Sequence, residues 1–345
     1  MLENLNRIVS SIGAGCWAIG DAATERGPIG RDGVDVEQAY RALVCAHELG
    51  ITLFDTYGLG QSERLLGRLL RYVGDTRRAE LVIAGKVGHL AGTVTHPCEP
   101  GQMRQQLETT LTNLCTNYLD LCFLHSDDFG PDDRFLEEAV LQILRFQQEG
   151  LIWAIGMQAP HAFAEEWKDA PHRSPEVRRF LELFYMIQPE VLTVPYNLLS
   201  PRYGSGETDI FEFAQRYDVS VIINQPFAQG LLTGSHHLGL PRQVSSDDHR
   251  ENPFFQPHVL QAVHQALQEV AEHFGDRPED RTRTALRYAL HREPNTPVLV
   301  GFRDAQQIAM ALTSLGPPLT SEEVTLLRHL TDPAAQIMQG LPHPF

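Results

Sequence analysis

The feature that most constrains the fold is a regular alternation of short apolar runs with longer segments whose apolar residues recur at helical spacing. Short apolar runs bounded by glycine, proline or polar residues are typical of buried strands, and the segments between them are typical of amphipathic helices. Strands that alternate with helices form parallel sheets, and the eight units found here predict a (β/α)8 TIM barrel of the α/β class. The predicted strands span residues 8–17, 51–54, 81–86, 118–125, 152–157, 191–194, 219–224 and 296–301.

The predicted helices complete the pattern and continue beyond the last strand. A final helical segment predicts a C-terminal helical extension of a single domain over residues 1–345. Residues 235–256, after the seventh strand, lack any pattern, and a loop of this length is commonly functional, so we expect a lid there. A doubly wound open sheet is the alternative, because the pattern alone does not reveal closure. The helices are predicted at 35–49, at 62–72 with Ser62 as N-cap, at 100–114, 136–148, within 161–186, and at 208–217, 257–273, 280–291, 304–312 and 320–330.

Composition narrows the class of partner. The chain of 345 residues is 42% hydrophobic, which is enough for a large core, and carries a formal net charge of −16. Nucleic acids and anionic membranes require clustered cations, so we expect neither of them as a partner and favour a small molecule. No leader peptide or long apolar stretch is evident, which makes a cytoplasmic location the expectation. Nothing in the sequence indicates an oligomeric state.

The cysteines and histidines do not form a recognisable metal site. The five cysteines are scattered without a CxxC pair, and we expect them to be reduced thiols. His89, His96 and Cys98 lie close together in one predicted loop, but their spacing is not one of the usual ligand spacings. No metal ion is therefore predicted.

Ionisable residues end three successive predicted strands. The run at 51–54 leads into Asp55 and Tyr57. The next strand ends at Lys86, and the one after it ends at His125. The carboxyl ends of barrel strands converge on one mouth, and alternation along an extended chain places Asp55 and Tyr57 on the same side. Each residue alone could be a turn former, a solvated strand end or a buried histidine, but their joint occurrence favours a catalytic site.

Several short motifs resemble those of the aldo-keto reductases and follow one another along nearly the whole chain. The matching segments are 13–17 (GAGCW), 54–67, 107–125, 154–156, 195–199 (PYNLL), 226–234 and 298–303 (VLVGFR). The chain is thus identified as a divergent member of that superfamily, which implies an oxidoreductase that reduces a carbonyl with a hydride from NADPH. By this resemblance Tyr57 is the general acid and Lys86 lowers the pKa of its phenol. Asp55 would pair with the lysine, and His125 would orient the substrate carbonyl.

The same resemblance implies a nicotinamide site, with several departures from the family pattern. Met157 stands where a serine is usual, Thr193 where a glutamine is usual, and Asn224 where an aromatic ring is usual. Residues 310–311 replace a common Glu-Asn pair. Arg303 could meet a 2′-phosphate after the last strand, which favours NADPH and leaves NADH open. The residues expected to bind the cofactor are Cys16, Trp17, Gln158, Thr193, Asn224, Gln225, Phe227, Gly301, Arg303 and Gln307.

The spacing between Asp55 and Tyr57 leaves the chemistry open. The family commonly places its tyrosine five positions after the aspartate, whereas Tyr57 comes two positions after Asp55. Either Tyr57 still reaches the substrate oxygen, or His125 or a water acts as the acid. The predicted function is NAD(P)H-dependent reduction of an aldehyde or ketone to an alcohol. The alternatives are a catalytically weak, nucleotide-binding regulatory or scaffold protein on the same barrel, and a variant elimination or epimerisation enzyme.

Overall fold

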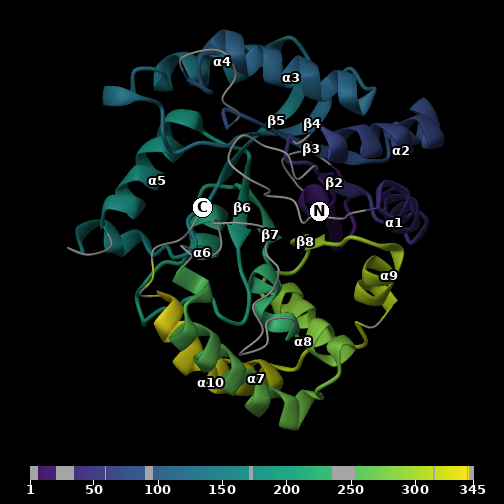
Figure 1. The fold of residues 1–345 in the computed structure, drawn as a ribbon. Coiled ribbons are helices and arrows are strands. Elements are labelled where there is room, and N and C mark those ends of the chain that lie inside the picture. The colour runs from purple at the N-terminus through teal and green to yellow at the C-terminus, as the bar shows by residue number, and fades with distance from the viewer. Residues whose placement is uncertain are drawn as a thin grey trace.

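The computed structural model describes residues 7–20, 35–58, 60–89, 96–170, 174–234, 253–313, 315–339 and 341. Within them, parallel strands pair in chain order from the first to the eighth, and the first also pairs with the eighth, so that the sheet closes into a barrel (Figure 1). The predicted (β/α)8 TIM barrel is confirmed, and its closure excludes the open sheet. The strands are β1 (Ile12–Gly15), β2 (Leu53–Asp55), β3 (Val82–Val87), β4 (Leu119–Leu124), β5 (Ile152–Gln158), β6 (Val191–Pro195), β7 (Ser220–Asn224) and β8 (Val298–Gly301).

Helices form the outer layer around this barrel (Figure 1). The α-helices are α1 (Val36–Glu48), α2 (Gln61–Arg78), α3 (Pro100–Leu114), α4 (Leu136–Gln148), α5 (Ser174–Ile187), α6 (Ile210–Arg216), α7 (Pro257–Phe274), α8 (Pro278–His291), α9 (Ala305–Thr313) and α10 (Ser321–Gln339). Short 3-10 helices occupy Cys16–Ile19, Pro131–Asp133, Glu165–Asp169, Ala228–Thr233 and Pro253–Phe255. Helix α1 packs beside α9, and α10 packs against α7. Of the predicted lid at 235–256, residues 235–252 lie outside the described part of the chain.

Helix α2 differs from its prediction at both ends. Ser62 is not the N-cap, because Gly60 holds that position and Ser62 lies in the first turn with its side chain buried. The helix also continues to Arg78, across Gly74, instead of ending near residue 72. Gly74 has a φ of 76°, a conformation that glycine adopts at little cost, so the chain bends there and remains helical on both sides.

Helix α10 is longer than predicted. It passes through Pro333, which lacks the N–H of an ordinary helical residue, and continues to Gln339. The turns after the proline remain helical because Ala334, Ala335 and Met338 are almost fully buried. Packing thus outweighs the local preference of proline in this segment.

Alternate strand residues fill the interior of the barrel. A Cβ on Gly156 would lie 2.3 Å from the rigid Phe123 ring, so that strand needs glycine there, and a Cβ on Gly13 would lie 2.8 Å from a methyl group of Leu299, which would have to shift. Since side chains alternate along a strand, the next inward position toward each carboxyl end faces the mouth of the barrel. The interior cluster consists of Leu53, Val82, Ala84, Leu121, Phe123, Ala154, Val191, Ile222 and Leu299.

A buried ion pair holds the opposite end of the barrel. Asp120 in β4 is fully buried and accepts hydrogen bonds from Arg78 at 2.8 Å and Arg7 at 2.9 Å. It also accepts one from a backbone N–H of β3 at 3.0 Å. Trp153, at the start of β5, stacks on Tyr118 with ring centroids 4.8 Å apart. The amino ends of β3, β4 and β5 are therefore joined through side chains as well as through the sheet.

We predict that replacing Asp120 by alanine strongly destabilises the fold. The substitution leaves the Arg78 guanidinium, whose side chain is 8% exposed, without its carboxylate, and such a loss costs about 3–5 kcal/mol. Urea denaturation followed by circular dichroism measures the free energy of unfolding. The Glu149→Ala variant breaks the exposed pair with Arg104 and is the matched control, with an expected loss below about 1 kcal/mol. Equal losses in the two variants would contradict the assignment.

Candidate active site

Lys86 and Asp55 meet at the carboxyl ends of β3 and β2. Lys86 is the penultimate residue of its strand and is only 8% exposed, and Asp55 is the last residue of its strand. The Nζ atom of Lys86 lies 2.5 Å from Oδ1 of Asp55 and 2.7 Å from the carbonyl oxygen of Thr56. Burial raises the pKa of Asp55, and the ammonium acts against this rise. A buried cation is thus held by one carboxylate and one carbonyl.

Tyr57 lies beside this pair despite its short spacing from Asp55. Nζ of Lys86 is 5.6 Å from the centroid of the Tyr57 ring. The ring of His125, the residue directly after β4, is 5.4 Å from the Tyr57 ring in an edge-to-face arrangement. The shortened turn therefore leaves Tyr57, Lys86 and His125 grouped at one mouth of the barrel.

A second histidine, which the sequence analysis did not assign to catalysis, belongs to this group. Nε2 of His89 donates a hydrogen bond to the carbonyl oxygen of Tyr57 at 2.9 Å. The ring centroid of His89 lies 5.2 Å from that of Tyr57 and 5.6 Å from that of His125. No motif marks this position. The one available signal was its place three residues after Lys86, in the loop that leaves a barrel strand at its carboxyl end.

Both imidazoles are neutral at physiological pH. Burial lowers the pKa of His89 to about 4, against the opposing effect of its hydrogen bond to Tyr57, and the Lys86 charge adds to the fall. Burial also lowers the pKa of His125 well below its usual range, with further contributions from Lys86 and His89. A neutral imidazole can donate one hydrogen bond without placing a second cation beside the lysine.

The loop residues considered for a metal point in different directions. His96 stacks on Phe135 with ring centroids 5.1 Å apart, and the Cys98 thiol donates to the Gly88 carbonyl oxygen at 3.4 Å. His89 instead contacts Tyr57. Among the described residues, no group of three or more His, Cys, Asp or Glu side chains is arranged to hold a metal ion.

Four of the expected cofactor residues occupy inward positions on their strands, and all of them except Thr193 are the last residue of the strand. They are Gln158 of β5, Thr193 of β6, Asn224 of β7 and Gly301 of β8. Oδ1 of Asn224 is buried and has no hydrogen-bond partner in the described part of the chain. An unsatisfied buried acceptor costs about 1–3 kcal/mol, so a ligand N–H that reaches it is favoured. This end of the site fits a carboxamide such as that of a nicotinamide.

Arg303 provides a positive charge just after β8. In the described ranges its guanidinium makes no ion pair and no hydrogen bond, and burial lowers its pKa. The backbone N–H of Arg303 donates to Oε1 of Gln307 at 3.0 Å, so Gln307 braces the loop. A Cβ at Gly301 would meet no atom within 4 Å, which leaves the backbone open on that side. The segment fits a phosphate-bearing ligand at the start of α9.

The other expected cofactor residues differ in how much of the side chain is accessible. The side chain of Cys16 is fully buried in the core between sheet and helices, so only its backbone can contact a ligand. Trp17 and Phe227 are half-buried. Gln225 has a positive φ of 53°, and its carbonyl oxygen accepts a hydrogen bond from Asn197 at 3.0 Å. These contacts fix the chain after β7.

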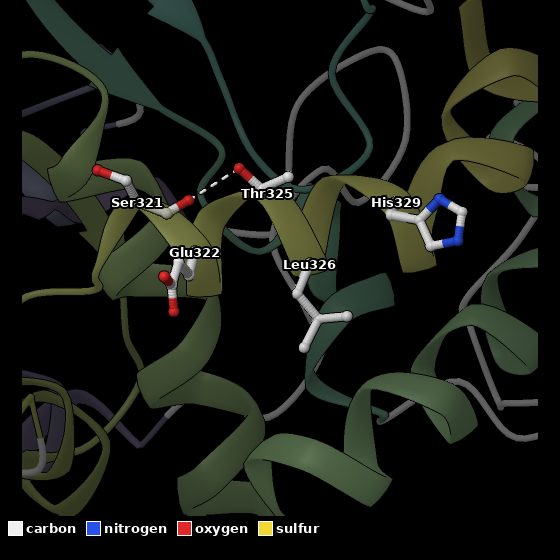
Figure 2. Close-up of a pocket in the computed structure, with 5 residues that line it drawn as sticks. All are labelled: Ser321, Glu322, Thr325, Leu326 and His329. Atoms are coloured by element: carbon white, nitrogen blue, oxygen red, sulfur yellow. Dashed lines mark hydrogen bonds between the residues drawn. The ribbon is translucent and has the colours of Figure 1, made fainter.

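A surface hollow on α10 is separate from the mouth (Figure 2). All five lining residues come from this one helix, where the Thr325 hydroxyl donates to the Ser321 carbonyl oxygen at 2.8 Å. Because α10 packs against α7 on the outside of the barrel, this hollow does not include the strand ends. The lining residues are Ser321, Glu322, Thr325, Leu326 and His329.

Of the helices described, none is both long enough and apolar enough to cross a membrane.

Known proteins resemble this chain in sequence over most of its length. L-galactose dehydrogenase of Arabidopsis thaliana is 25% identical, over 89% of this chain and 84% of its own. The NADH-specific methylglyoxal reductase of Escherichia coli is 23% identical, over 94% of this chain and 95% of its own.

A solved structure shares the fold, and a family profile identifies the family. The glycerol dehydrogenase of Gluconobacter oxydans superposes with a TM-score of 0.70 at 23% identity, covering 98% of this chain and 95% of that one, which supports the fold alone. The profile described as the Aldo/keto reductase family matches residues 11–332. The chain therefore belongs to the aldo/keto reductase family of oxidoreductases.

Proposed function

We propose that this protein reduces an aldehyde or a ketone to the corresponding alcohol. The reduced nicotinamide, when bound, supplies the hydride to the carbonyl carbon. Tyr57 gives its hydroxyl proton to the carbonyl oxygen, which becomes the hydroxyl of the product. The observation that carries the proposal is the placement of Lys86, with Nζ 2.5 Å from the Asp55 carboxylate and 5.6 Å from the Tyr57 ring centroid.

The Lys86 ammonium stabilises the phenolate that Tyr57 becomes when it releases its proton. Asp55 keeps the amine charged in a buried place, and the Thr56 carbonyl fixes the direction of a second N–H. Because these groups come from the ends of two paired strands, they are already arranged before the reaction. A preorganised cation of this kind stabilises charge without a further cost of reorganisation.

Neutral His125 is the group that orients the substrate. Hydride addition places negative charge on the carbonyl oxygen, and an imidazole N–H directed at that oxygen stabilises the charge as it develops. The ring of His125 lies edge-to-face with that of Tyr57, 5.4 Å between centroids, so that both can approach the same oxygen. Its lowered pKa keeps it neutral and avoids repulsion with Lys86.

The preferred cofactor in this proposal is NADPH. Arg303 forms no salt bridge among the described residues, although the Asp304 carboxylate acts on its charge from the next position. A 2′-phosphate, which NADPH carries and NADH lacks, would pair with its guanidinium. Gln158, Thr193 and Asn224 would receive the nicotinamide carboxamide. Similarity to an NADH-specific reductase makes NADH the alternative cofactor.

One observation favours the alternative of a regulatory or scaffold protein with weak catalysis. Met157, which replaces a usual serine of the family, is only 5% exposed and offers no hydrogen-bond donor. Without the hydrogen bond that a serine would donate, the nicotinamide ring is bound more weakly. Under this alternative the protein binds nucleotide, and substitutions at Lys86 change little apart from nucleotide affinity.

We predict that Lys86→Met lowers kcat at least about 100-fold, because positioned proton transfer contributes about 10²- to 10⁴-fold and Tyr57 loses the cation that supports it. Loss of NADPH absorbance with a panel of aldehydes and ketones measures the rate. NADPH titration by fluorescence shows whether the variant still folds and binds.

The matched control for this experiment is Lys168→Met. Lys168 is the other lysine of the chain and is exposed on the 3-10 helix Glu165–Asp169. We expect its kcat to equal that of the wild type. An active Lys86→Met enzyme would remove the lysine from the mechanism. A wild-type protein that binds nucleotide without reducing any carbonyl would favour the regulatory alternative.

We also predict that Arg303→Ala raises the Kd for NADPH about 10- to 100-fold, since a hydrogen bond to a charged group contributes about 1.5–3 kcal/mol. The Kd for NADH should change less than about twofold, because its ribose has no phosphate at that position. Fluorescence titration of both nucleotides measures the two constants. Arg104→Ala, whose guanidinium pairs with Glu149, is the control and should leave both constants unchanged. Parallel losses for NADPH and NADH would assign Arg303 a role other than phosphate recognition.

A further inference from the structure

We propose that His89 is a positioning residue that holds Tyr57 in place of the longer turn found in the family. The inference rests on the proposed function, in which Tyr57 donates the proton. Its basis is the hydrogen bond from Nε2 of His89 to the Tyr57 carbonyl oxygen, at 2.9 Å. That bond connects the loop after β3 to the residue whose hydroxyl must reach the substrate.

The short turn after β2 is fastened to β3 at consecutive residues. The backbone N–H and the hydroxyl of Thr56 both donate to the Ala84 carbonyl oxygen, at 2.9 and 3.1 Å. The Thr56 carbonyl accepts from Lys86 at 2.7 Å, and the Tyr57 carbonyl accepts from His89. Two side chains from the same stretch of chain, Lys86 and His89, therefore donate hydrogen bonds to two successive carbonyl oxygens. With so few residues between Asp55 and Tyr57, these bonds set the position of the tyrosine directly.

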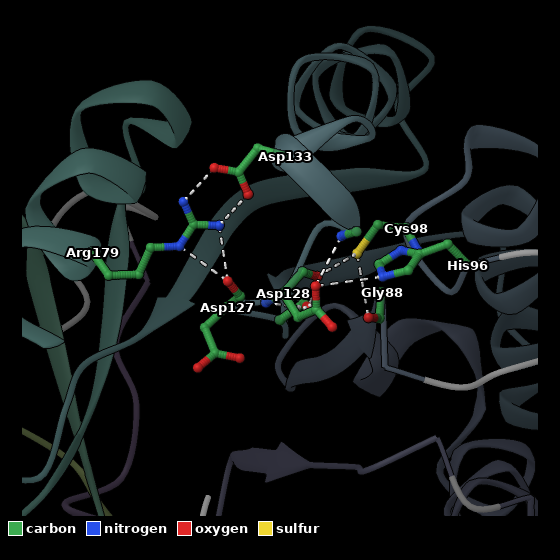
Figure 3. A network of polar contacts seen from close by, with 9 residues as sticks. Gly88, His96, Cys98, Asp127, Asp128, Asp133 and Arg179 are labelled. Carbon is green, nitrogen blue, oxygen red and sulfur yellow. Dashed lines mark hydrogen bonds and ion pairs between the residues drawn. The ribbon is translucent and has the colours of Figure 1, made fainter. Parts of the chain in front are cut away.

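His89 is itself held by its neighbour Gly88. The Gly88 N–H donates to Oε1 of Gln106 in α3 at 3.0 Å, and the Gly88 carbonyl accepts from the Cys98 thiol at 3.4 Å (Figure 3). Gly88 has a φ of 86°, and a Cβ there would lie 3.1 Å from Leu124 and 3.2 Å from the Cys98 sulfur. Both groups of the Gly88 backbone are satisfied, so the chain enters His89 in one defined direction.

The same hydrogen-bond network connects the loop after β3, which carries His89, to the loop after β4, which carries His125. The Cys98 sulfur lies 3.9 Å from the carbonyl oxygen of Asp128 (Figure 3). One residue earlier, the Asp127 carbonyl accepts a hydrogen bond from Arg179 of α5 at 2.9 Å, and Arg179 also pairs with Asp133 at 2.6 Å. The loops that carry His89 and His125 are therefore braced together outside the mouth.

The protonation state of His89 fits its role as an anchor, that is, as the hydrogen-bond donor that holds Tyr57 in position. Its Nε2–H is committed to Tyr57, while Nδ1 is buried and has no partner in the described part of the chain. A second proton on Nδ1 would be buried without an acceptor. The titratable groups near the His89 ring are Lys86, Tyr57 and the neutral ring of His125. The tautomer with the proton on Nε2 is thus the stable one, and the anchor persists at neutral pH.

The test compares His89→Phe, which keeps a ring without a donor, with His89→Gln, whose amide N–H can replace Nε2–H. We expect His89→Phe to lower kcat about 10- to 100-fold, since a small misplacement of a reacting group costs that much, and to leave the Kd for NADPH unchanged. His89→Gln should recover most of the lost kcat. A general packing defect would instead affect both variants and nucleotide binding alike.

Thermal unfolding by circular dichroism shows that the variants fold. Wild-type kcat in His89→Phe would overturn the proposal, as would equal impairment of the two variants, because the hydrogen bond would then have no part in the effect. A wild-type protein without carbonyl reductase activity would refute the proposed function, and the anchor is then tested separately.

That separate test is nitrogen NMR of histidine-labelled protein, with His89→Gln used to assign the signal. We expect a protonated Nε2 and an unprotonated Nδ1 from neutral pH down to an apparent pKa near 4. The opposite tautomer, or a mixture of tautomers, would overturn the proposal whatever the activity of the enzyme.

Discussion

The mouth of the barrel depends on one buried cation, the ammonium of Lys86. Its side chain is 8% exposed, and the two oxygens that receive its hydrogen bonds come from Asp55 and Thr56 at the end of β2. A charge in this setting needs such partners, because desolvation of an ion costs several kcal/mol. The same ammonium opposes the rise in the pKa of Asp55 and adds to the fall in the pKa of His125. Burial is the larger cause of these shifts, and the ion pair modifies the charge states of the groups around Tyr57.

The barrel could be predicted from the sequence because its signals are local and repeated. Apolar runs identify the strands, and alternation then assigns the inward positions without knowledge of the packing. The errors arose where packing overrides local preference. Ser62 has the right chemistry for an N-cap, but the helix begins one residue before it and buries its side chain. Pro333 is typical of a helix end, yet α10 continues because the turn after it is buried.

The grouping of Asp55, Tyr57, Lys86 and His125 followed from strand ends and from the resemblance, whereas His89 did not. Its contact is with a backbone carbonyl, and neither residue type nor spacing in the sequence reports such a contact. From the sequence, His89 was considered only as a possible metal ligand, together with His96 and Cys98 of the same loop. The positive φ of Gly88 turns the chain so that His89 faces Tyr57, while His96 stacks on Phe135 and Cys98 contacts Gly88. Loop geometry, which the sequence does not encode in a simple pattern, decided the role of this residue.

The Asp120 carboxylate at the amino end of the barrel and two polar groups at the mouth differ in how their hydrogen-bonding capacity is satisfied. At the amino end, the Asp120 carboxylate is fully buried and receives hydrogen bonds on both of its oxygens. At the mouth, Asn224 has a buried oxygen with no hydrogen-bond partner in the part of the chain described, and Arg303 makes no ion pair there. Native proteins leave few buried polar atoms unsatisfied, since each costs free energy. The Asn224 oxygen and the Arg303 guanidinium, which both lie at the mouth, are therefore positions where a ligand can supply the missing partner.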